Sequence, residues 1–118
     1  MLGFTPLVRT SGPIDTVVDR SIGEQLLAVL REALSNVARH SEADAATVEV
    51  EAIDVEVVLR VTDNGRGLPA ARRESGLRNV RRRADQLGGR LRFLEEEPHG
   101  TRVEWTVPLS GTSAPSPA

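Results

Sequence analysis

Two strand-like segments that lie almost end to end in the sequence place the strongest limit on the fold of this chain. The first, ATVEVEAI at residues 46–53, alternates apolar and polar residues as a half-buried β-strand does. Only Asp54 separates it from the second, VEVVLRVT at residues 55–62, which is more apolar and is expected to be more buried. Because so short a connection joins neighbouring antiparallel strands, the chain is expected to contain a sheet with antiparallel pairing.

A helical pattern precedes this pair of strands, and another follows it. The first runs from about residue 20 to residue 41, and its apolar stripe consists of Leu26, Leu30, Leu34 and Val37, with Ala33 beside them. The second runs from about residue 75 to residue 87, and its apolar stripe consists of Leu77, Val80, Ala84 and Leu87. Gly88 and Gly89 are expected to end the second helix.

Three further segments complete the predicted elements. FTPLVRT near the N-terminus is typical of a short strand, in which Pro6 is compatible with an edge position or with the start of the strand. RLRFLEE (90–96) and TRVEWTVPL (101–109) are typical of a hairpin. The order β, α, β, β, α, β, β predicts an α/β (α+β) two-layer sandwich, with a mixed, mostly antiparallel sheet and both helices on one face. Residues 1–109 are expected to form one domain, and residues 110–118 have the composition of a disordered C-terminal tail.

Composition excludes several kinds of site. The net charge of −2 gives no electrostatic preference for nucleic acid or for anionic membranes. Without any cysteine the chain has no disulfide, thiol nucleophile or cysteine-based zinc site, which suits a reducing cytoplasm. No window approaches the roughly 18 apolar residues of a membrane span, and the N-terminus lacks the features of a signal peptide. We therefore expect a cytoplasmic domain that makes no membrane contact.

Three polar residues on the first helix form a row of chemically different groups. Glu32, Asn36 and His40 are four residues apart, so they lie on one ridge that ends at the border of the apolar stripe. The row supplies a carboxylate for a proton or a polarised water, an amide oxygen for a hard cation, and a donor for phosphate oxygens. Taken alone, it is also compatible with a solvated helix face.

The stretch DNGRGLP at residues 63–69 follows the buried strand directly. It is compatible with a plain turn, but no matching strand comes after it to make a two-residue hairpin. Gly65 and Gly67 allow positive φ and leave no side chain in the way, so a flat ligand could approach the main chain closely. Asp63, fixed at the end of a buried strand, can accept a hydrogen bond from an exocyclic amine.

Two other short motifs are weaker when taken singly. In ESGLRNV, Ser75 can cap the second helix and Gly76 leaves its first amides bare, which is a natural site for phosphate. In HGTRVEW, Gly100 and Thr101 stand at the start of a strand, where the simplest interpretation is a hairpin turn.

In order and spacing, these segments resemble the ATP-binding domain shared by sensor histidine kinases, the gyrase ATPase region, Hsp90 and MutL. REALSNVARH resembles the N box, DNGRGL the first glycine box, SGLRNV the second, and HGTRVEWTVPL the closing Gly-Thr strand. The resemblance covers about residues 22–109 and implies a Bergerat-type ATP-binding fold. GLRNVRRRADQLGGRLRF and the short lid at residues 68–75 resemble the NarL/DesK type, and most nearly a mycobacterial DevS/DosT-like kinase.

The resemblance implies roles for the residues on the base side of the site. Asp63 would accept the adenine amino group, and Thr101 would assist through water or its own hydroxyl. Gly65 and Gly67 would let the base and the lid pack closely.

On the phosphate side, the resemblance implies ATP bound together with Mg²⁺. Asn36 would ligate the ion, and Glu32 occupies the position often given a general-base or polarising role. The other residues that would lie at or beneath the phosphates are Arg39, His40, Gly76 and Leu77. Arg31 departs from the Gln or Asn common in the family, and Val80 from the common Met, which leaves the detail of the pocket open.

The function implied is that of the ATP- and Mg-binding catalytic domain of a two-component sensor histidine kinase, an ATP-dependent phosphotransferase. It would supply the γ-phosphoryl group to a histidine on a dimerisation helix. The two histidines, His40 and His99, are not in a His-Asp or His-Glu dipeptide on an amphipathic helix. The acceptor and dimerisation helices are therefore expected N-terminal to residue 1, and the response regulator is a partner of the full-length kinase. We expect this chain to bind ATP without phosphorylating itself.

Two alternatives stay open at the level of sequence. A free-standing serine kinase of the anti-sigma-factor type would share the nucleotide site and would phosphorylate a protein serine. A nucleic-acid-binding module is suggested by a set of arginines in the second half: Arg72, Arg73, Arg78, Arg81, Arg82, Arg83, Arg90 and Arg92. Against nucleic acid, no aromatic side chains interleave with these arginines to stack on bases, and three glutamates follow closely.

Overall fold

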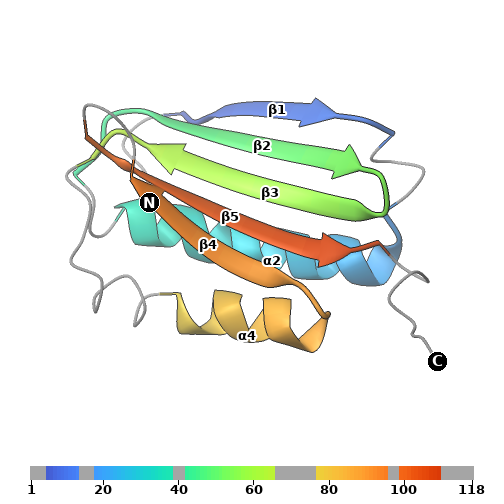
Figure 1. The fold of residues 1–118 in the computed structure, drawn as a ribbon. Coiled ribbons are helices and arrows are strands. Elements are labelled where there is room, and N and C mark those ends of the chain that lie inside the picture. The colour runs from blue at the N-terminus through green and yellow to red at the C-terminus, as the bar shows by residue number, and fades with distance from the viewer. Residues whose placement is uncertain (1–4, 14–17, 39–41, 66–76, 96–98, 110–118) are drawn as a thin grey trace.

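Five strands form one sheet, and two helices pack against one of its faces, in the part of the chain that the structure describes (Figure 1). The computed structural model describes residues 5–13, 18–38, 42–65, 77–95 and 99–109. The strands are β1 (Leu7–Ser11), β2 (Ala46–Ile53), β3 (Glu56–Asp63), β4 (Arg90–Glu95) and β5 (Thr101–Pro108). The helices are α2 (Arg20–Asn36) and α4 (Arg78–Gln86). The predicted two-layer α/β sandwich is confirmed.

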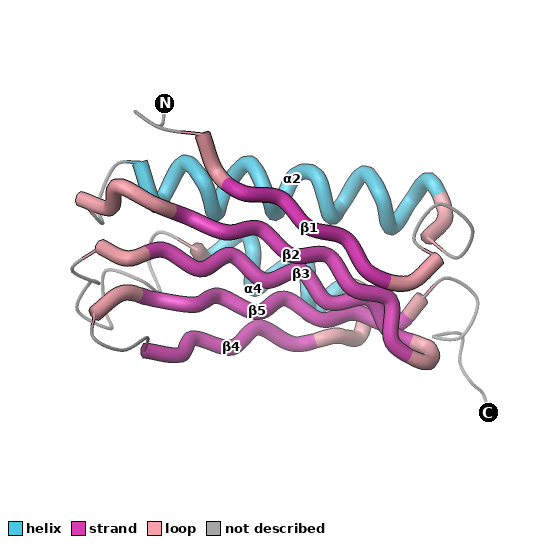
Figure 2. The backbone as a smooth tube through the Cα atoms, turned by 90° about the horizontal axis from the view of Figure 1, so that it is seen from above, coloured by secondary structure: helices cyan, strands magenta, loops and turns pink. Residues whose placement is uncertain are grey.

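The strand order β1-β2-β3-β5-β4 places β3 in the middle of the sheet and β1 and β4 at its edges (Figure 2). β1 runs parallel to β2, and the other three pairs are antiparallel. The parallel pair follows from the connection through α2, because parallel neighbours need a crossover rather than a tight turn. The mixed sheet and the edge position of the first strand are as the sequence predicts.

The hairpin of β2 and β3 is the centre of the sheet. Its register runs from Ala46 opposite Asp63 to Ile53 opposite Glu56. Asp54 turns the chain with a φ of 53°, a left-handed conformation that aspartate tolerates better than most residues. Ala46, Val48 and Val50 of β2 are buried and the residues between them are half-buried, so the predicted alternation is confirmed over this part of the strand.

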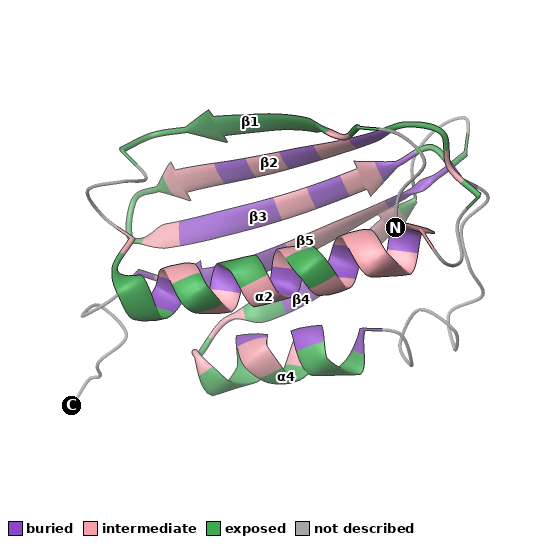
Figure 3. Ribbon diagram, turned by 180° about the vertical axis from the view of Figure 1, so that it is seen from behind, coloured by how far each residue is buried: buried purple, intermediate pink, exposed green. Residues whose placement is uncertain are grey.

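The core lies between the sheet and the two helices (Figure 3). Val57, Leu59 and Trp105 from the central strands are at most 1% exposed. Asp19 caps α2, and its carboxylate Oδ1 accepts a hydrogen bond from the Ile22 N–H at 2.8 Å.

The apolar stripe of α2 differs from the predicted one. The buried residues include Val29 and Ala33, whereas Leu30 and Leu34 are only half-buried. At about 100° per residue, this turns the core-facing side by about 50° from the predicted direction. The turn is toward the ridge that carries Glu32 and Asn36. The prediction gave most weight to leucine, but the closest packing against the sheet is made by smaller side chains.

The ends of the two helices agree in part with the prediction. The regular α-helix of α2 ends at Asn36, with Val37 as its C-cap, and residues 37–38 continue as π-helix. The predicted stretch from residue 39 to residue 41 lies outside the described residues. α4 begins at Arg78, and its C-terminus is closed by Gly88, whose φ is 76°, and by the Gly89 N–H, which donates to the Ala84 carbonyl at 2.8 Å. This ending confirms the predicted glycine stop.

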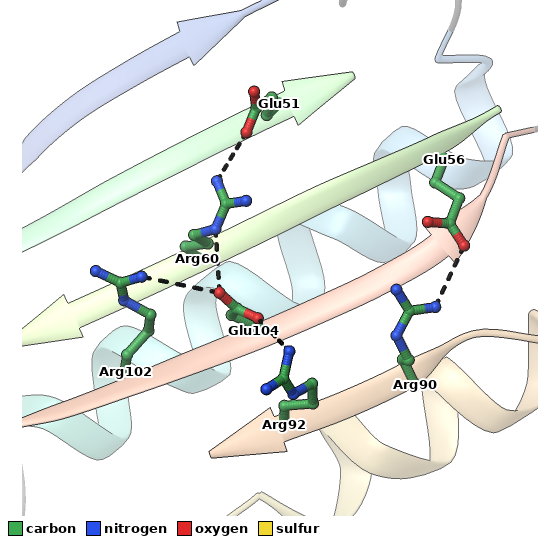
Figure 4. A network of polar contacts seen from close by, with 7 residues as sticks. All are labelled: Glu51, Glu56, Arg60, Arg90, Arg92, Arg102 and Glu104. Carbon is green, nitrogen blue, oxygen red and sulfur yellow. Dashed lines mark hydrogen bonds and ion pairs between the residues drawn. The ribbon is translucent and has the colours of Figure 1, made fainter. Parts of the chain in front are cut away.

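The outer face of the sheet, opposite α2 and α4, carries ion pairs across the strands (Figure 4). Arg60 on β3 bonds to Glu51 on β2 at 2.9 Å and to Glu104 on β5 at 3.2 Å. Arg92 and Arg102 lie 3.5 and 3.9 Å from the same Glu104. The hydrogen bond to Glu51 raises the pKa of Arg60, although burial opposes it, so the guanidinium stays charged. Unlike charges opposite one another stabilise neighbouring strands.

Two further predictions concern the C-terminal tail and the absence of a membrane span. The tail at residues 110–118 lies outside the described residues. Within the described residues, neither helix combines the length and the apolar character that a membrane crossing requires.

Candidate functional site

Four element ends meet at one end of the molecule. There α2 ends, β3 ends, β5 begins and α4 begins (Figure 1). These ends carry the residues that the sequence singled out: Asn36 closes α2, Asp63 closes β3, Thr101 opens β5 and Leu77 precedes α4. The fold therefore brings to one end of the molecule four residues that are separated in the sequence by 14 or more positions.

Asp63 is a buried carboxylate at the end of the central strand. Its residue is 7% exposed. Its Oδ1 accepts a hydrogen bond from the Gly65 N–H at 2.8 Å. Burial raises the pKa of Asp63, and the bond from Gly65 partly offsets this rise. A carboxylate held in a fixed direction at a strand end is suited to accept a hydrogen bond from a bound donor.

Thr101 is the direct neighbour of Asp63 on the next strand. The two residues are opposite one another in the β3–β5 ladder, and both are buried. Gly100, just before Thr101, has a φ of 129°. A Cβ at this position would collide with the Asp63 carbonyl oxygen and lie 3.1 Å from the Asn64 Cα. The close approach of the two strands at this point therefore requires glycine.

Asn36 presents an amide oxygen that has no partner among the described residues. Its Oδ1 is buried and accepts no hydrogen bond there. A buried acceptor left unpaired costs free energy, so such atoms are usually explained by strain, an ion, water or a function. Glu32, one turn earlier on α2, is half-buried. The turn of the helix toward this ridge accounts for the burial of the Asn36 oxygen.

In the sequence, Asn64 lies in a stretch that is compatible with a plain turn, and the structure gives its side chain a different role. Its Oδ1 accepts hydrogen bonds from the N–H groups of Asp44 and Ala45, both at 3.0 Å. Its Nδ2 donates to the Asp44 carboxylate at 2.7 Å. An asparagine in a loop often forms hydrogen bonds with nearby backbone groups, so the residue type gave one signal for this role. The partner of Asn64 lies 20 residues away in the sequence and could not be inferred.

His99 also meets this region, from the connection that leads into β5. Its Nδ1 lies 3.2 Å from the Gly65 carbonyl oxygen. The backbone of Gly65 therefore has two contacts: its N–H donates to Asp63, and its carbonyl oxygen lies next to His99.

Some predicted site residues are not tested by this geometry. Arg39, His40, Gly67 and Gly76 lie outside the described residues. Leu77 is 1% exposed and belongs to the core, so its side chain does not face a ligand and only its backbone could do so.

The described part of the site shows no cage of acidic or imidazole ligands around a metal position. Among the described residues, no group of three or more His, Cys, Asp or Glu is placed to hold an ion. The Asn36 amide oxygen is buried and has no partner among the described residues. It fits the chemistry of Mg²⁺, which usually takes one or two protein oxygens together with substrate phosphates and water.

Comparison with protein families gives a match over most of the chain. Residues 22–111 match the family described as "Histidine kinase-, DNA gyrase B-, and HSP90-like ATPase".

Two curated bacterial proteins are similar in sequence. The chain is 34% identical over 98 residues to sensor histidine kinase LiaS of Bacillus subtilis, a match that covers 80% of this chain and 27% of that protein. It is 34% identical over 99 residues to sensor protein VraS of Staphylococcus aureus, covering 81% of this chain and 28% of that protein. The chain spans about a quarter of the length of these relatives.

Solved structures show the same fold. Full-length ShkA in complex with AMPPNP matches with a TM-score of 0.73 and 23% identity, covering 91% of this chain and 26% of that one. The ATP-binding domain of PrrB from Mycobacterium tuberculosis matches with a TM-score of 0.69 and 21% identity, covering 89% and 82%. The chain therefore belongs to the histidine kinase-, DNA gyrase B- and HSP90-like ATPase family, as a catalytic domain of the sensor histidine kinase kind.

Proposed function

We propose that this chain binds ATP together with Mg²⁺ and supplies the γ-phosphoryl group to a histidine that lies outside residues 1–118. The parent protein would be a two-component sensor kinase of the NarL/DesK type. The observation that carries this proposal is the buried Asp63 carboxylate opposite Thr101, at the same end of the molecule as the unpaired Asn36 oxygen. The similarity to LiaS and VraS supports it. The narrower likeness to DevS/DosT-like kinases stays a prediction.

Base recognition is assigned to the end of β3. The Asp63 carboxylate would accept a hydrogen bond from the adenine amino group, with the Thr101 hydroxyl beside it. Because Asp63 is fixed by the sheet and by Gly65, its acceptor atom needs no rearrangement when a base arrives. Gly65, and Gly67 outside the described residues, would leave room for the base and the lid. A purine without the amino group would lose this bond and bind more weakly.

The phosphate side is assigned to the end of α2. Asn36 would provide an oxygen ligand for Mg²⁺. When bound, the ion would neutralise negative charge on the phosphates as the γ-phosphoryl group leaves. Glu32 would orient or polarise the attacking group from the preceding turn of the helix. Arg39, His40 and Gly76 would lie near the phosphates, with the Leu77 backbone at the start of α4.

The partners follow from the same proposal. The acceptor histidine and the dimerisation helices would belong to the parent kinase, and a response regulator would receive the phosphoryl group from it. The cytoplasmic location stays a prediction from the sequence.

Calorimetric titration tests the proposal directly. The chain is titrated with ATP, ADP and GTP, with and without Mg²⁺. We expect ATP and ADP to bind, GTP to bind at least about tenfold more weakly, and Mg²⁺ to increase the affinity for ATP. No heat with any adenine nucleotide would overturn the assignment.

A further inference from the structure

The side chain of Asn64 joins two segments that are distant in sequence. It makes the three hydrogen bonds to Asp44 and Ala45 described above, and its own N–H donates to the Ala45 carbonyl at 3.2 Å. All four bonds connect the residue just after β3 with the residues just before β2.

The chemistry of these bonds selects an amide. The oxygen must accept from two backbone N–H groups, and the nitrogen must donate to a carboxylate, so only one orientation of the Asn64 amide satisfies all partners. Aspartate at position 64 could accept from both N–H groups but would bring a second carboxylate against Asp44. A small apolar residue would make none of the side-chain bonds.

The bonds lie next to the base-recognition carboxylate. The β2–β3 ladder ends with Asp63 opposite Ala46, and the β3–β5 ladder ends with Asp63 opposite Thr101. The bonds of Asn64 to Asp44 and Ala45 continue the contact between the β3 and β2 segments by one residue beyond the end of the ladder. On the other side Gly100 packs against the backbone of Asp63 and Asn64. Asp63 is therefore held between two attachments, and only the Asn64 attachment depends on a side chain that reaches across to another segment.

We propose that Asn64 is a positioning residue for base recognition: through Asp44 and Ala45 it fixes the direction of the Asp63 carboxylate toward the purine amino group. This inference rests on the proposed function and deepens it. Asn64 itself does not touch the base. Its effect is on how selectively the site binds a purine that carries the amino group.

The probes are ATP and purine riboside 5′-triphosphate, which lacks the exocyclic amine. The measured quantity is the ratio of their two dissociation constants. In the unaltered chain ATP is expected to bind at least about tenfold more tightly, the value of one well-placed hydrogen bond to a charged group. Asn64→Ala should reduce this ratio to about two or less, because the Asp63 carboxylate is no longer held in one direction. Gln86→Ala, which removes an exposed amide at the far end of α4, is the matched control and should leave the ratio unchanged.

Exchanging the side chains of Asn64 and Asp44 distinguishes a role in positioning Asp63 from a general loss of protein stability. Asn64→Asp alone should reduce the ratio at least as much as Asn64→Ala, because two carboxylates then face one another. The double variant Asn64→Asp with Asp44→Asn restores one acceptor for the two N–H groups and one amide donor. It should recover the ratio to within about threefold of the unaltered chain.

A measurement without nucleotide completes the test. The Gly65 N–H donates to Asp63, so its amide NMR signal reports the direction of that carboxylate. The signal should shift in Asn64→Ala and Asn64→Asp and return in the double variant.

The outcomes separate the two levels of the proposal. An unaltered chain that binds neither nucleotide overturns the proposed function and this inference with it. A chain that discriminates, together with an Asn64→Ala variant that discriminates equally well and keeps its Gly65 signal, overturns the inference alone. Failure of the double variant to recover the ratio also overturns it, and if Asn64→Ala does not fold, the double variant decides.

Discussion

At the scale of single residues, the candidate site depends on two buried polar groups, the Asp63 carboxylate and the Asn36 amide oxygen. Asp63 is a carboxylate kept where burial disfavours its charge, and Asn36 has a buried oxygen without a partner among the described residues. Both arrangements cost free energy in the empty protein. A nucleotide with its cation would supply a donor to the first and a positive charge to the second.

The raised pKa of Asp63 makes a prediction about stability and pH. The pKa of Asp63 in the folded protein is above its ordinary value of 3.8. Protonation of Asp63 therefore stabilises the folded state at low pH, and this stabilisation is lost as the pH rises through the folded pKa. Asp63→Asn carries no such charge, so we expect its thermal midpoint to exceed that of the unaltered chain at pH 7. The difference should shrink toward pH 4. The fluorescence of Trp105, the only tryptophan and fully buried, follows the unfolding.

The same variant should fail in binding. Replacement of the charged acceptor should lower ATP affinity by about 10- to 100-fold, the range that corresponds to one hydrogen bond to a charged group. An Asp63→Asn chain that is less stable at pH 7 by the same amount as at pH 4, or that keeps its ATP affinity, would contradict this interpretation of Asp63.

Asn36→Ala is expected to separate the metal side from the base side. ATP affinity in the presence of Mg²⁺ should fall about tenfold, while adenosine affinity stays within about twofold, because adenosine has no phosphate to share a cation. The apo protein should lose less than about 1 kcal/mol of unfolding free energy, since the lost oxygen makes no bond within the described protein. Calorimetry with both ligands measures this. Equal losses for ATP and adenosine would remove Asn36 from the metal site.

At the scale of elements, the start of β5 packs so closely against the end of β3 that no side chain fits at Gly100. Gly100→Ala should lower the unfolding free energy by more than about 2 kcal/mol and weaken ATP binding, because the new Cβ collides with the Asp63 backbone. Gly88→Ala is the matched control. It shares the positive φ, but its nearest neighbour is the Pro108 Cγ at 4.0 Å. It should lose about 1 kcal/mol and leave binding unchanged. Urea denaturation distinguishes the two, and similar losses would refute the collision.

The ion pairs of the outer face belong to the sheet and not to the site. Arg60→Met should lower the unfolding free energy by about 1 kcal/mol at low salt and by less in 1 M salt, because Glu51 and Glu104 lose a shared partner. Arg90→Met, whose pair with Glu56 is more exposed, should cost less than about 0.5 kcal/mol. ATP affinity should not change in either variant. Altered ATP binding by Arg60→Met would show that the outer face communicates with the site.

Most elements could be predicted because their signals are local. The β2–β3 alternation, the turn at Asp54 and the glycine stop of α4 each follow from a few neighbouring residues. The face of α2 could not be placed correctly, because which apolar residue packs closest depends on the sheet above it. The hydrogen bonds of Asn64 could not be predicted from the sequence either, because the tertiary structure determines which residues lie next to its side chain.

At the scale of the whole molecule, binding and phosphoryl transfer are expected to be separate. Incubated with γ-labelled ATP, the chain of residues 1–118 should bind the nucleotide and acquire no acid-labile phosphate, because neither histidine is in a His-Asp or His-Glu dipeptide of the kind expected for an acceptor. His40 and His99 are its only histidines. Asp63→Asn serves as the control that binds ATP more weakly. Acid-labile label on either histidine would contradict the expectation.

The place of β3 in the strand order has a consequence for how the molecule opens. β3 is the middle strand, whereas β1 pairs on one side only and has all five residues exposed. Edge strands open with little free energy, and central ones open only when most of the domain unfolds. Deuterium should therefore enter β1 early and β3 late. The carboxylate that would meet the base is thus carried by the last part of the sheet to come apart, so a molecule that has shed its first strand can still keep hold of its nucleotide.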